Sequence, residues 1–265
     1  MDGHAAIVAL PPSTIANPSP PHQHTHTVVF LHGRGDNAPS FSQLLAQWRD
    51  SSNQTLLTHF PTFRWVFPQA PVRRVASSPN GGSEAWPQWF DVWNVRDFAD
   101  NEGLQAEGLR EVIPAIRQIL ADEAALLGGR WDKVVLAGIS MGAATGAHVL
   151  FNLNISAAAP RLGAFLGFSC RCPFAGRPSL EEMRAVLWGP VVSGNDDAIL
   201  RNTPVLLEHC IDDPLVLVEN GREMGRILTS FGATVERREY PAGGHWFNSP
   251  HGLDDMVHFL KVHLS

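Results

Sequence analysis

The chain has 265 residues, of which 44% are hydrophobic and 17% are charged, and its formal net charge is −6. This length suffices for one large hydrophobic core, and the composition is that of a globular enzyme with many tight loops. Because acidic residues exceed basic ones and no basic stripe is present, we expect no nucleic-acid partner.

The cysteines indicate a reducing compartment, and the termini show no signal for secretion or lipidation. The three cysteines are an odd number, and Cys170 and Cys172 are too close in the chain for an ordinary mutual disulfide. The N-terminus lacks a basic segment followed by an apolar core, Asp2 excludes N-myristoylation, and the C-terminus lacks a prenylation cysteine. No apolar run approaches the roughly 20 residues of a membrane-spanning helix. We therefore expect a soluble cytoplasmic protein without a transmembrane segment.

The predicted elements follow a leader. Residues 1–26 are expected to form a flexible leader or an edge segment, because the stretch from Leu10 to Pro21 is dense in Pro, Ser and Asn. Short runs rich in branched apolar residues then predict strands, over residues 27–31, 65–68, 133–137, 162–168, 205–209 and 234–239. Helical spacing of apolar residues predicts helices between them, near residues 41–48, 104–127, 141–150, 215–228 and 253–264. This alternation predicts an α/β fold with a mostly parallel central sheet and helices on both faces.

Two features interrupt the alternation. Pro114 is expected to bend or divide the predicted helix over residues 104–127. Residues 72–101 and 170–202 are long and irregular, and the first of these segments holds Trp86, Trp89 and Trp93. Loops of this length in an α/β domain usually shape a binding site.

A Gly-x-Ser-x-Gly motif lies between a predicted strand and a predicted helix, with Ser140 at its centre. Gly138 and Gly142 let the chain turn tightly, so that the serine projects into a cleft and the helix directs its positive end at the same place. This order is typical of the nucleophile of an α/β-hydrolase fold, and we predict one such domain over residues 27–265. An ordinary serine in a turn is the alternative interpretation.

A serine nucleophile needs a base to take its proton and a carboxylate to orient that base. In this fold the acid and then the histidine follow the nucleophile, each after a later strand. Asp213 follows the strand over residues 205–209, and His245 follows the last predicted strand in a glycine loop. Asp212 competes with Asp213 for the acid role, and the pattern alone favours neither strongly.

We expect the other histidines to have structural roles. His209 lies inside a predicted strand, and the remaining candidates lie on or near the terminal helix, where packing or surface roles are expected, namely His251, His258 and His263. His22, His24 and His26 alternate along one segment, but no cysteine or carboxylate joins them nearby. We therefore expect no metal and no cofactor.

Acyl transfer also requires two donors to the oxyanion that forms on the substrate carbonyl. The first is predicted to be the backbone N–H of Met141, directly after the nucleophile. The second is expected from the glycine-containing loop over residues 32–36, and we assign it to the backbone N–H of Arg34. That loop fits neither a dinucleotide-binding nor a P-loop fingerprint.

Taken together, these motifs resemble the acyl-protein thioesterase and lysophospholipase/carboxylesterase family, and the fungal members most of all. The resemblance covers about residues 27–260 and is carried by residues 30–36, 67–71, 89–91, 138–144, 167–170, 213–216 and His245. It implies a compact hydrolase without a large lid domain, which acts on acyl esters or on thioesters such as S-palmitoyl cysteine. It also implies that Asp213, directly before Pro-x-Val, is the acid of the triad.

The chain departs from that family near the nucleophile. Met141 stands where the family commonly has Gln, Cys210 replaces a Gly after His209, and Trp246 and Phe247 add bulk beside His245. We expect an apolar acyl pocket near the aromatic residues, with Trp86, Trp89, Trp93 and Trp246 as its substrate-binding side chains.

The leading functional hypothesis is a serine hydrolase whose substrate is a small acyl ester or an acylated protein. An acyltransferase or cyclase that uses the same triad is the first alternative, because Met141 and the aromatic residues would make the pocket drier. A non-catalytic binding protein on the same fold is the second. The sequence is also compatible with a homodimer.

Overall fold

A computed structural model describes residues 9–77, 84–156, 160–190 and 197–264. Its central sheet has seven strands in the order β1-β3-β2-β6-β7-β8-β9. These strands are β1 (Thr14–Ala16), β2 (His26–Leu31), β3 (Phe63–Phe67), β6 (Val134–Ile139), β7 (Ala164–Phe168), β8 (Val205–Cys210) and β9 (Val235–Tyr240). All neighbouring pairs are parallel except β1 with β3. The predicted mostly parallel sheet is therefore confirmed, and each predicted strand corresponds to one that is observed.

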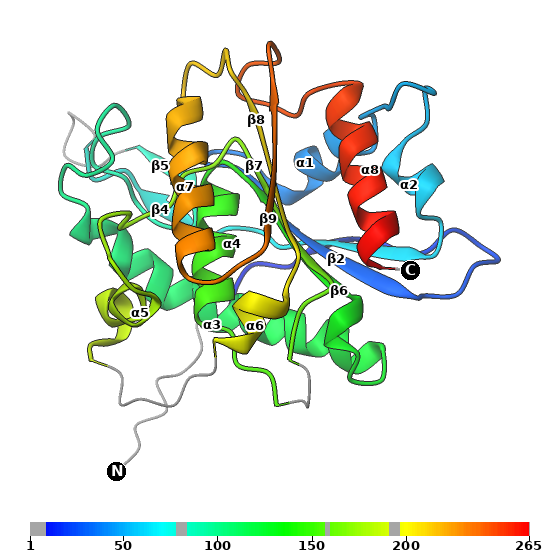
Figure 1. Cartoon of the computed structure of the whole chain (residues 1–265), viewed down its shortest axis with the longest axis horizontal. Helices are drawn as coiled ribbons and strands as arrows, with labels where there is room; N and C mark the ends of the chain where they lie inside the picture. The colour runs from blue at the N-terminus through cyan, green and yellow to red at the C-terminus, as the bar shows by residue number, and fades with distance from the viewer. Residues whose placement is uncertain (1–8, 78–83, 157–159, 191–196, 265) are drawn as a thin grey trace.

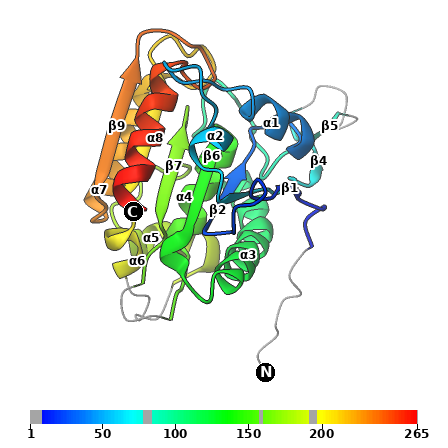
Figure 2. The ribbon, with the colours of Figure 1, turned by 90° about the vertical axis from the view of Figure 1, so that its right-hand side faces the viewer.

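Helices cover both faces of this sheet, as predicted (Figure 1). The face shown with α8 (His251–His263) also carries α1 (Ala38–Leu45) and α2 (Leu56–His59). The other face carries the remaining α-helices of the described chain, which are α3 (Gly103–Leu126), α4 (Met141–Phe151), α5 (Leu180–Trp188), α6 (Ala198–Asn202) and α7 (Val218–Ser230). Figure 2 shows the sheet between α8 and the helices α3 and α4. No helix in the described residues is both long and apolar enough to cross a bilayer.

Two hydrophobic cores result from the alternation of side chains along the strands. In β2, Val29 and Leu31 belong to the core beneath α3 and α4, whereas Val28 and Phe30 belong to the core beneath α1 and α8. Successive side chains of a strand point to opposite faces, so a central strand that is covered on both sides becomes apolar at every position. This explains why the central strands β2, β6 and β7 appear in the sequence as nearly continuous apolar runs.

Pro114 does not divide the long helix, so that part of the expectation was wrong. The residue lies inside the single helix α3. The predicted apolar face of this helix is buried, with Leu109, Val112 and Ile116 each at most 1% exposed. An interior proline costs an isolated helix about 3 kcal/mol, but burial of several large apolar side chains outweighs that cost.

The segments that the sequence left irregular contain short elements. Residues 72–101 include a small antiparallel pair, β4 (Val72–Arg74) and β5 (Ala85–Pro87), and residues 170–202 include α5 and α6. β1 also lies within the predicted leader and pairs with β3 at the edge of the sheet. The division into residues 1–26 and a domain over residues 27–265 stays a prediction.

We expect His148 to make the stability of the fold sensitive to acid. It is fully buried in α4, where its Nε2 lies 3.2 Å from the Pro173 carbonyl oxygen and its ring packs against Phe151 and Phe174. Burial lowers the pKa of His148 to about 4. The unfolded chain, with a histidine pKa of about 6.5, binds the proton more strongly. Stability should therefore fall as pH drops from about 6.5 towards 4, by up to about 1.4 kcal/mol per pH unit from this residue.

Urea unfolding at pH 7 and pH 5 tests this expectation. The variant His148→Gln keeps a donor for the Pro173 carbonyl and should lose less stability between the two values than the wild type. His258→Gln, at an exposed position on α8, is the control and should keep the wild-type difference. Equal losses for the wild type and His148→Gln would contradict the assignment.

Candidate active site

Ser140 occupies a tight turn between β6 and α4. Its backbone has φ 55° and ψ −122°, a region that residues other than glycine rarely adopt. A Cβ atom at Gly138 would lie 2.5 Å from the backbone nitrogen of Ala143, and one at Gly142 would collide with the carbonyl oxygen of Leu31. The Ser140 N–H donates to the carbonyl oxygen of Phe168 in β7 at 2.8 Å. Both glycines of the motif are therefore needed by close packing around the turn.

Asp213 and His245 meet beyond the carboxyl ends of β8 and β9. His245 Nδ1 lies 2.7 Å from Asp213 Oδ2. The other oxygen, Oδ1, accepts hydrogen bonds from the N–H groups of Leu215 at 2.9 Å and Val216 at 3.0 Å. Because the carboxylate accepts at Nδ1, that nitrogen carries the proton and Nε2 is left as a potential base.

Asp212 has a different role in this loop. Its carboxylate accepts from the N–H groups of Gly243 at 3.3 Å and Gly244 at 2.8 Å, and it makes no contact of this kind with His245. The structure thus places the predicted acid, Asp213, beside the histidine, and uses Asp212 to hold the loop that carries it.

Asp213 is a stable carboxylate. Burial alone raises its pKa, but hydrogen bonds from His209, from His245 and from the backbone N–H groups of Val216 and Leu215 outweigh that effect. The net pKa of Asp213 is well below its ordinary value. The group therefore stays charged at neutral and mildly acidic pH.

His209 is a contact of Asp213 that the sequence reasoning missed. Its Nε2 lies 2.8 Å from the Val216 carbonyl oxygen and 3.3 Å from Asp213 Oδ2. Two histidines, His209 and His245, therefore contact the same oxygen of Asp213. A Cβ atom at Gly221 would collide with the ring, which explains the glycine in α7. The spacing of four residues between His209 and Asp213 was the available signal, but the apolar strand context favoured a packing role.

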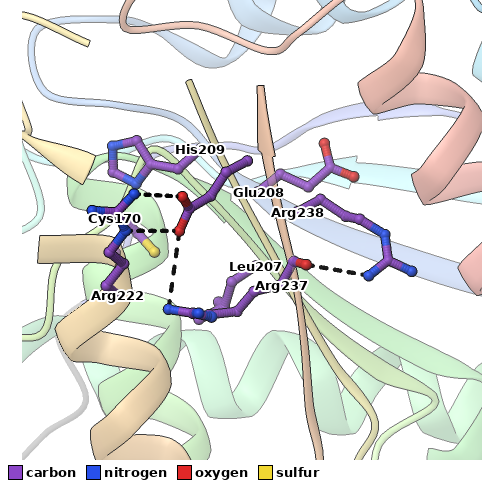
Figure 3. A pocket seen from close by; sticks show the side chains of 9 residues that line it. Cys170, Leu207, Glu208, His209, Arg222, Arg237 and Arg238 are labelled. Atoms are coloured by element: carbon purple, nitrogen blue, oxygen red, sulfur yellow. Dashed lines mark hydrogen bonds and ion pairs between the residues drawn. The ribbon is translucent and has the colours of Figure 1, made fainter. Parts of the chain in front are cut away.

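A small cavity lies beside His209 (Figure 3). It measures about 10 Å³ and is lined by residues that include Cys170, His209, Gly221 and the ion pair of Arg222 with Glu239. Figure 3 shows the side chain of Glu208 on the other side of the strands from His209 and Arg222. A volume of this size suits about one water molecule, so this cavity cannot hold a substrate.

A much larger cavity of about 760 Å³ is lined by both Ser140 and His245. Among the described residues, no hydrogen bond joins Ser140 Oγ to the imidazole, as is common in catalytic sites without substrate. Arg34 and Met141, whose N–H groups are the predicted oxyanion donors, also line this cavity. The four features predicted for acyl transfer therefore share one space.

The structure brings two of the four predicted substrate-binding tryptophans to the large cavity and places the other two elsewhere. Trp86 and Trp246 line the large cavity. Trp89 is fully buried and donates from Nε1 to the His32 carbonyl oxygen at 2.8 Å, so it belongs to the core. Trp93 is 43% exposed and is not among the lining residues. Phe247, also expected near the cleft, is buried against Trp48 with ring centroids 4.5 Å apart.

Cys170 and Cys172 are unsuited to act as alternative nucleophiles. Cys170 and Cys172 are buried, and burial raises the pKa of Cys170 to about 12 and that of Cys172 further. Because the thiolate is the reactive form, such thiols are inert. In the part of the chain that the structure describes, no three His, Cys, Asp or Glu side chains are grouped as metal ligands.

Known proteins resemble this chain over almost its whole length. The model of the phospholipase/carboxylesterase family matches residues 13–264. Acyl-protein thioesterase 1 of Gibberella zeae is 27% identical over 244 residues, which cover 91% of this chain and 92% of that protein. A probable carboxylesterase of Arabidopsis thaliana, named SOBER1-like, is 29% identical over 220 residues, covering 82% and 71% respectively. The crystal structure of Zea mays acyl-protein thioesterase 2 has a TM-score of 0.71 at 26% identity, covering 96% of this chain and 99% of that one.

Proposed function

The chain belongs to the phospholipase/carboxylesterase family, and on that premise we propose that it is a serine hydrolase that cleaves carboxylic esters or acyl thioesters. One observation carries the proposal: a serine on a strained strand-to-helix turn shares a cavity with a histidine whose Nδ1 is held by a buried carboxylate. Relatives named acyl-protein thioesterase and carboxylesterase support both substrate classes.

The positions of the side chains support the following reaction. Ser140 Oγ attacks the acyl carbon while His245 Nε2 takes the hydroxyl proton, and Asp213 stabilises the resulting imidazolium. The backbone N–H groups of Met141 and Arg34 stabilise the negative charge on the carbonyl oxygen. Collapse of the tetrahedral intermediate releases the alcohol or thiol, which receives the proton from His245. Water then attacks the acyl-enzyme by the same route and releases the free acid.

We further propose that the protein acts in the cytoplasm on a small acyl ester or an acylated protein. Cys170, Cys172 and Cys210 are all free and buried. Free cysteines are typical of reducing compartments, where disulfides are rare.

Product analysis tests hydrolysis directly. The purified protein is incubated with p-nitrophenyl butyrate and with a butyryl thioester, each with and without an added alcohol acceptor. We expect free butyrate to be the main product from both substrates in every case. Exclusive appearance of the acylated acceptor would show an acyltransferase instead, and no turnover of any substrate would contradict the proposed function.

A further inference from the structure

Arg171 lies at the junction of two cavities. It follows β7, whose end is adjacent to the turn of Ser140, and it lines the large cavity of about 760 Å³. It also lines an adjoining cavity of about 510 Å³, and the two cavities share Phe98, Pro214 and Leu215 among other residues. A substrate group that extends from Ser140 towards the second cavity would therefore pass Arg171.

The guanidinium of Arg171 is buried but has no carboxylate partner. The residue is only 7% exposed. Its Nη2 donates to Gln105 Oε1 at 2.6 Å, and its charge lies over the ring of Phe98 at 4.0 Å and that of Phe90 at 5.6 Å. Within the described residues, no acidic side chain forms an ion pair with it. Buried charges are normally paired, so this arrangement is unusual.

Glu102 is the acidic side chain whose charge acts on Arg171, but one of its carboxylate oxygens is hydrogen-bonded to another residue. Its Oε1 accepts from the N–H of Phe174 at 2.5 Å. Burial lowers the pKa of Arg171 to about 10, against the opposing effects of Cys172 and Glu102. The guanidinium is therefore still a cation at neutral pH, with most of its five N–H donors unused by Gln105.

The other two arginines that line the large cavity are either close to an acidic side chain or exposed to solvent. Arg34 donates to Gln88 at 2.7 Å, lies 3.8 Å from Asp91, and stacks over Trp86 at 4.8 Å. Arg96 is exposed to solvent, which screens its charge. Arg171 is thus the buried cation of this cavity that forms no ion pair with an acidic side chain of the described structure, and Glu102 acts on it only through its charge.

We propose that Arg171 binds a carboxylate of the substrate, so that the preferred substrates are esters or thioesters that carry a second, free carboxylate. The planar fork of an arginine matches a carboxylate with two parallel hydrogen bonds. One cation without an ion-pair partner suits one negative charge, whereas a phosphate monoester brings about 1.5 to 2 charges at neutral pH. Apolar lining residues such as Val92, Val95 and Phe98 would contact the chain between the carboxylate and the reacting carbonyl.

The inference rests on the proposed ester hydrolysis and is tested with matched substrates. In one pair, the p-nitrophenyl monoester of glutaric acid is compared with the same compound after methylation of its free carboxylate. In the other, the butyryl ester of 4-hydroxyphenylacetate is compared with that of the corresponding amide. The first pair places the carboxylate on the acyl part, and the second places it on the alcohol part. We expect kcat/KM to favour the carboxylate form by about tenfold or more in one of the two pairs.

The variant Arg171→Met keeps the length and apolar packing of the side chain but removes the charge. It should lower kcat/KM for the preferred carboxylate substrate by about 10- to 100-fold and change that of the neutral partner by less than about threefold. Arg171→Lys, which keeps the charge without the fork, should be intermediate and provides the measurement if the methionine variant does not fold. Arg226→Met, at an exposed arginine of α7 that lines neither cavity, is the matched control and should retain the preference.

The outcomes separate this inference from the proposed function. If the wild type hydrolyses the neutral esters but favours the carboxylate in neither pair, Arg171 is not a specificity residue and the proposed function stands. If Arg171→Met slows both members of a pair equally, its role is structural and the inference is wrong. If no ester is hydrolysed at all, the proposed function itself fails.

Discussion

Replacing Ser140 with alanine should lower kcat for p-nitrophenyl butyrate by about 10⁴- to 10⁶-fold, because the covalent route is lost with the hydroxyl. The fold should remain, since the change removes one oxygen atom and keeps a Cβ at the strained turn. Circular dichroism and urea unfolding check the fold. A fluorophosphonate probe should label the wild type and not the variant.

Ser169 offers a matched control for this experiment. It also has a positive φ, of 46°, follows the neighbouring strand β7, and is 1% exposed. Its hydroxyl lies 3.5 Å from the Trp246 carbonyl oxygen and has no role in the proposed reaction. Ser169→Ala should therefore retain labelling and most of the activity. Full esterase activity in Ser140→Ala would show that another group is the nucleophile.

The second large effect is expected at Asp213. Asp213→Asn should lower kcat by about 10³- to 10⁴-fold, because the amide no longer holds the Nδ1–H tautomer of His245 or stabilises its charged form. Both oxygens of this carboxylate are used, one by His245 and the other by the N–H groups of Leu215 and Val216. The loss should appear in kcat more than in KM, since the interaction develops in the transition state.

Asp212→Asn is the control that distinguishes the two adjacent acids. An asparagine there keeps one oxygen, which can accept from Gly244 as Oδ1 does, and loses only the longer hydrogen bond from Gly243 to Oδ2, so we expect less than about a tenfold loss of kcat. Equal losses in the two variants would mean that the acid has been assigned to the wrong residue. Steady-state kinetics with p-nitrophenyl butyrate suffices for this comparison.

The sequence analysis did not predict the shortest strands, and the reason is the same for each of them. The strand β1 and the pair β4–β5 are each three residues long, too short to show a period. They exist because a partner strand is present, as when Thr14 pairs with Phe67. Propensity alone does not stabilise such segments, so pairing decides them. Pro114 was misjudged for the related reason that packing of α3 outweighed a local cost.

The sequence by itself determined the α/β class, the order of the six longer strands along the chain, and the turn and loop in which Ser140 and His245 lie. These follow from local requirements: apolar runs for doubly covered strands, and glycines where Cβ atoms would collide. Tertiary structure alone brought His209 to Asp213, placed Trp89 in the core, and left Arg171 buried without an ion-pair partner among the described residues. All three results depend on contacts between segments that are distant in the chain and on the exclusion of solvent from the interior. Neither can be read from a residue and its neighbours in the sequence.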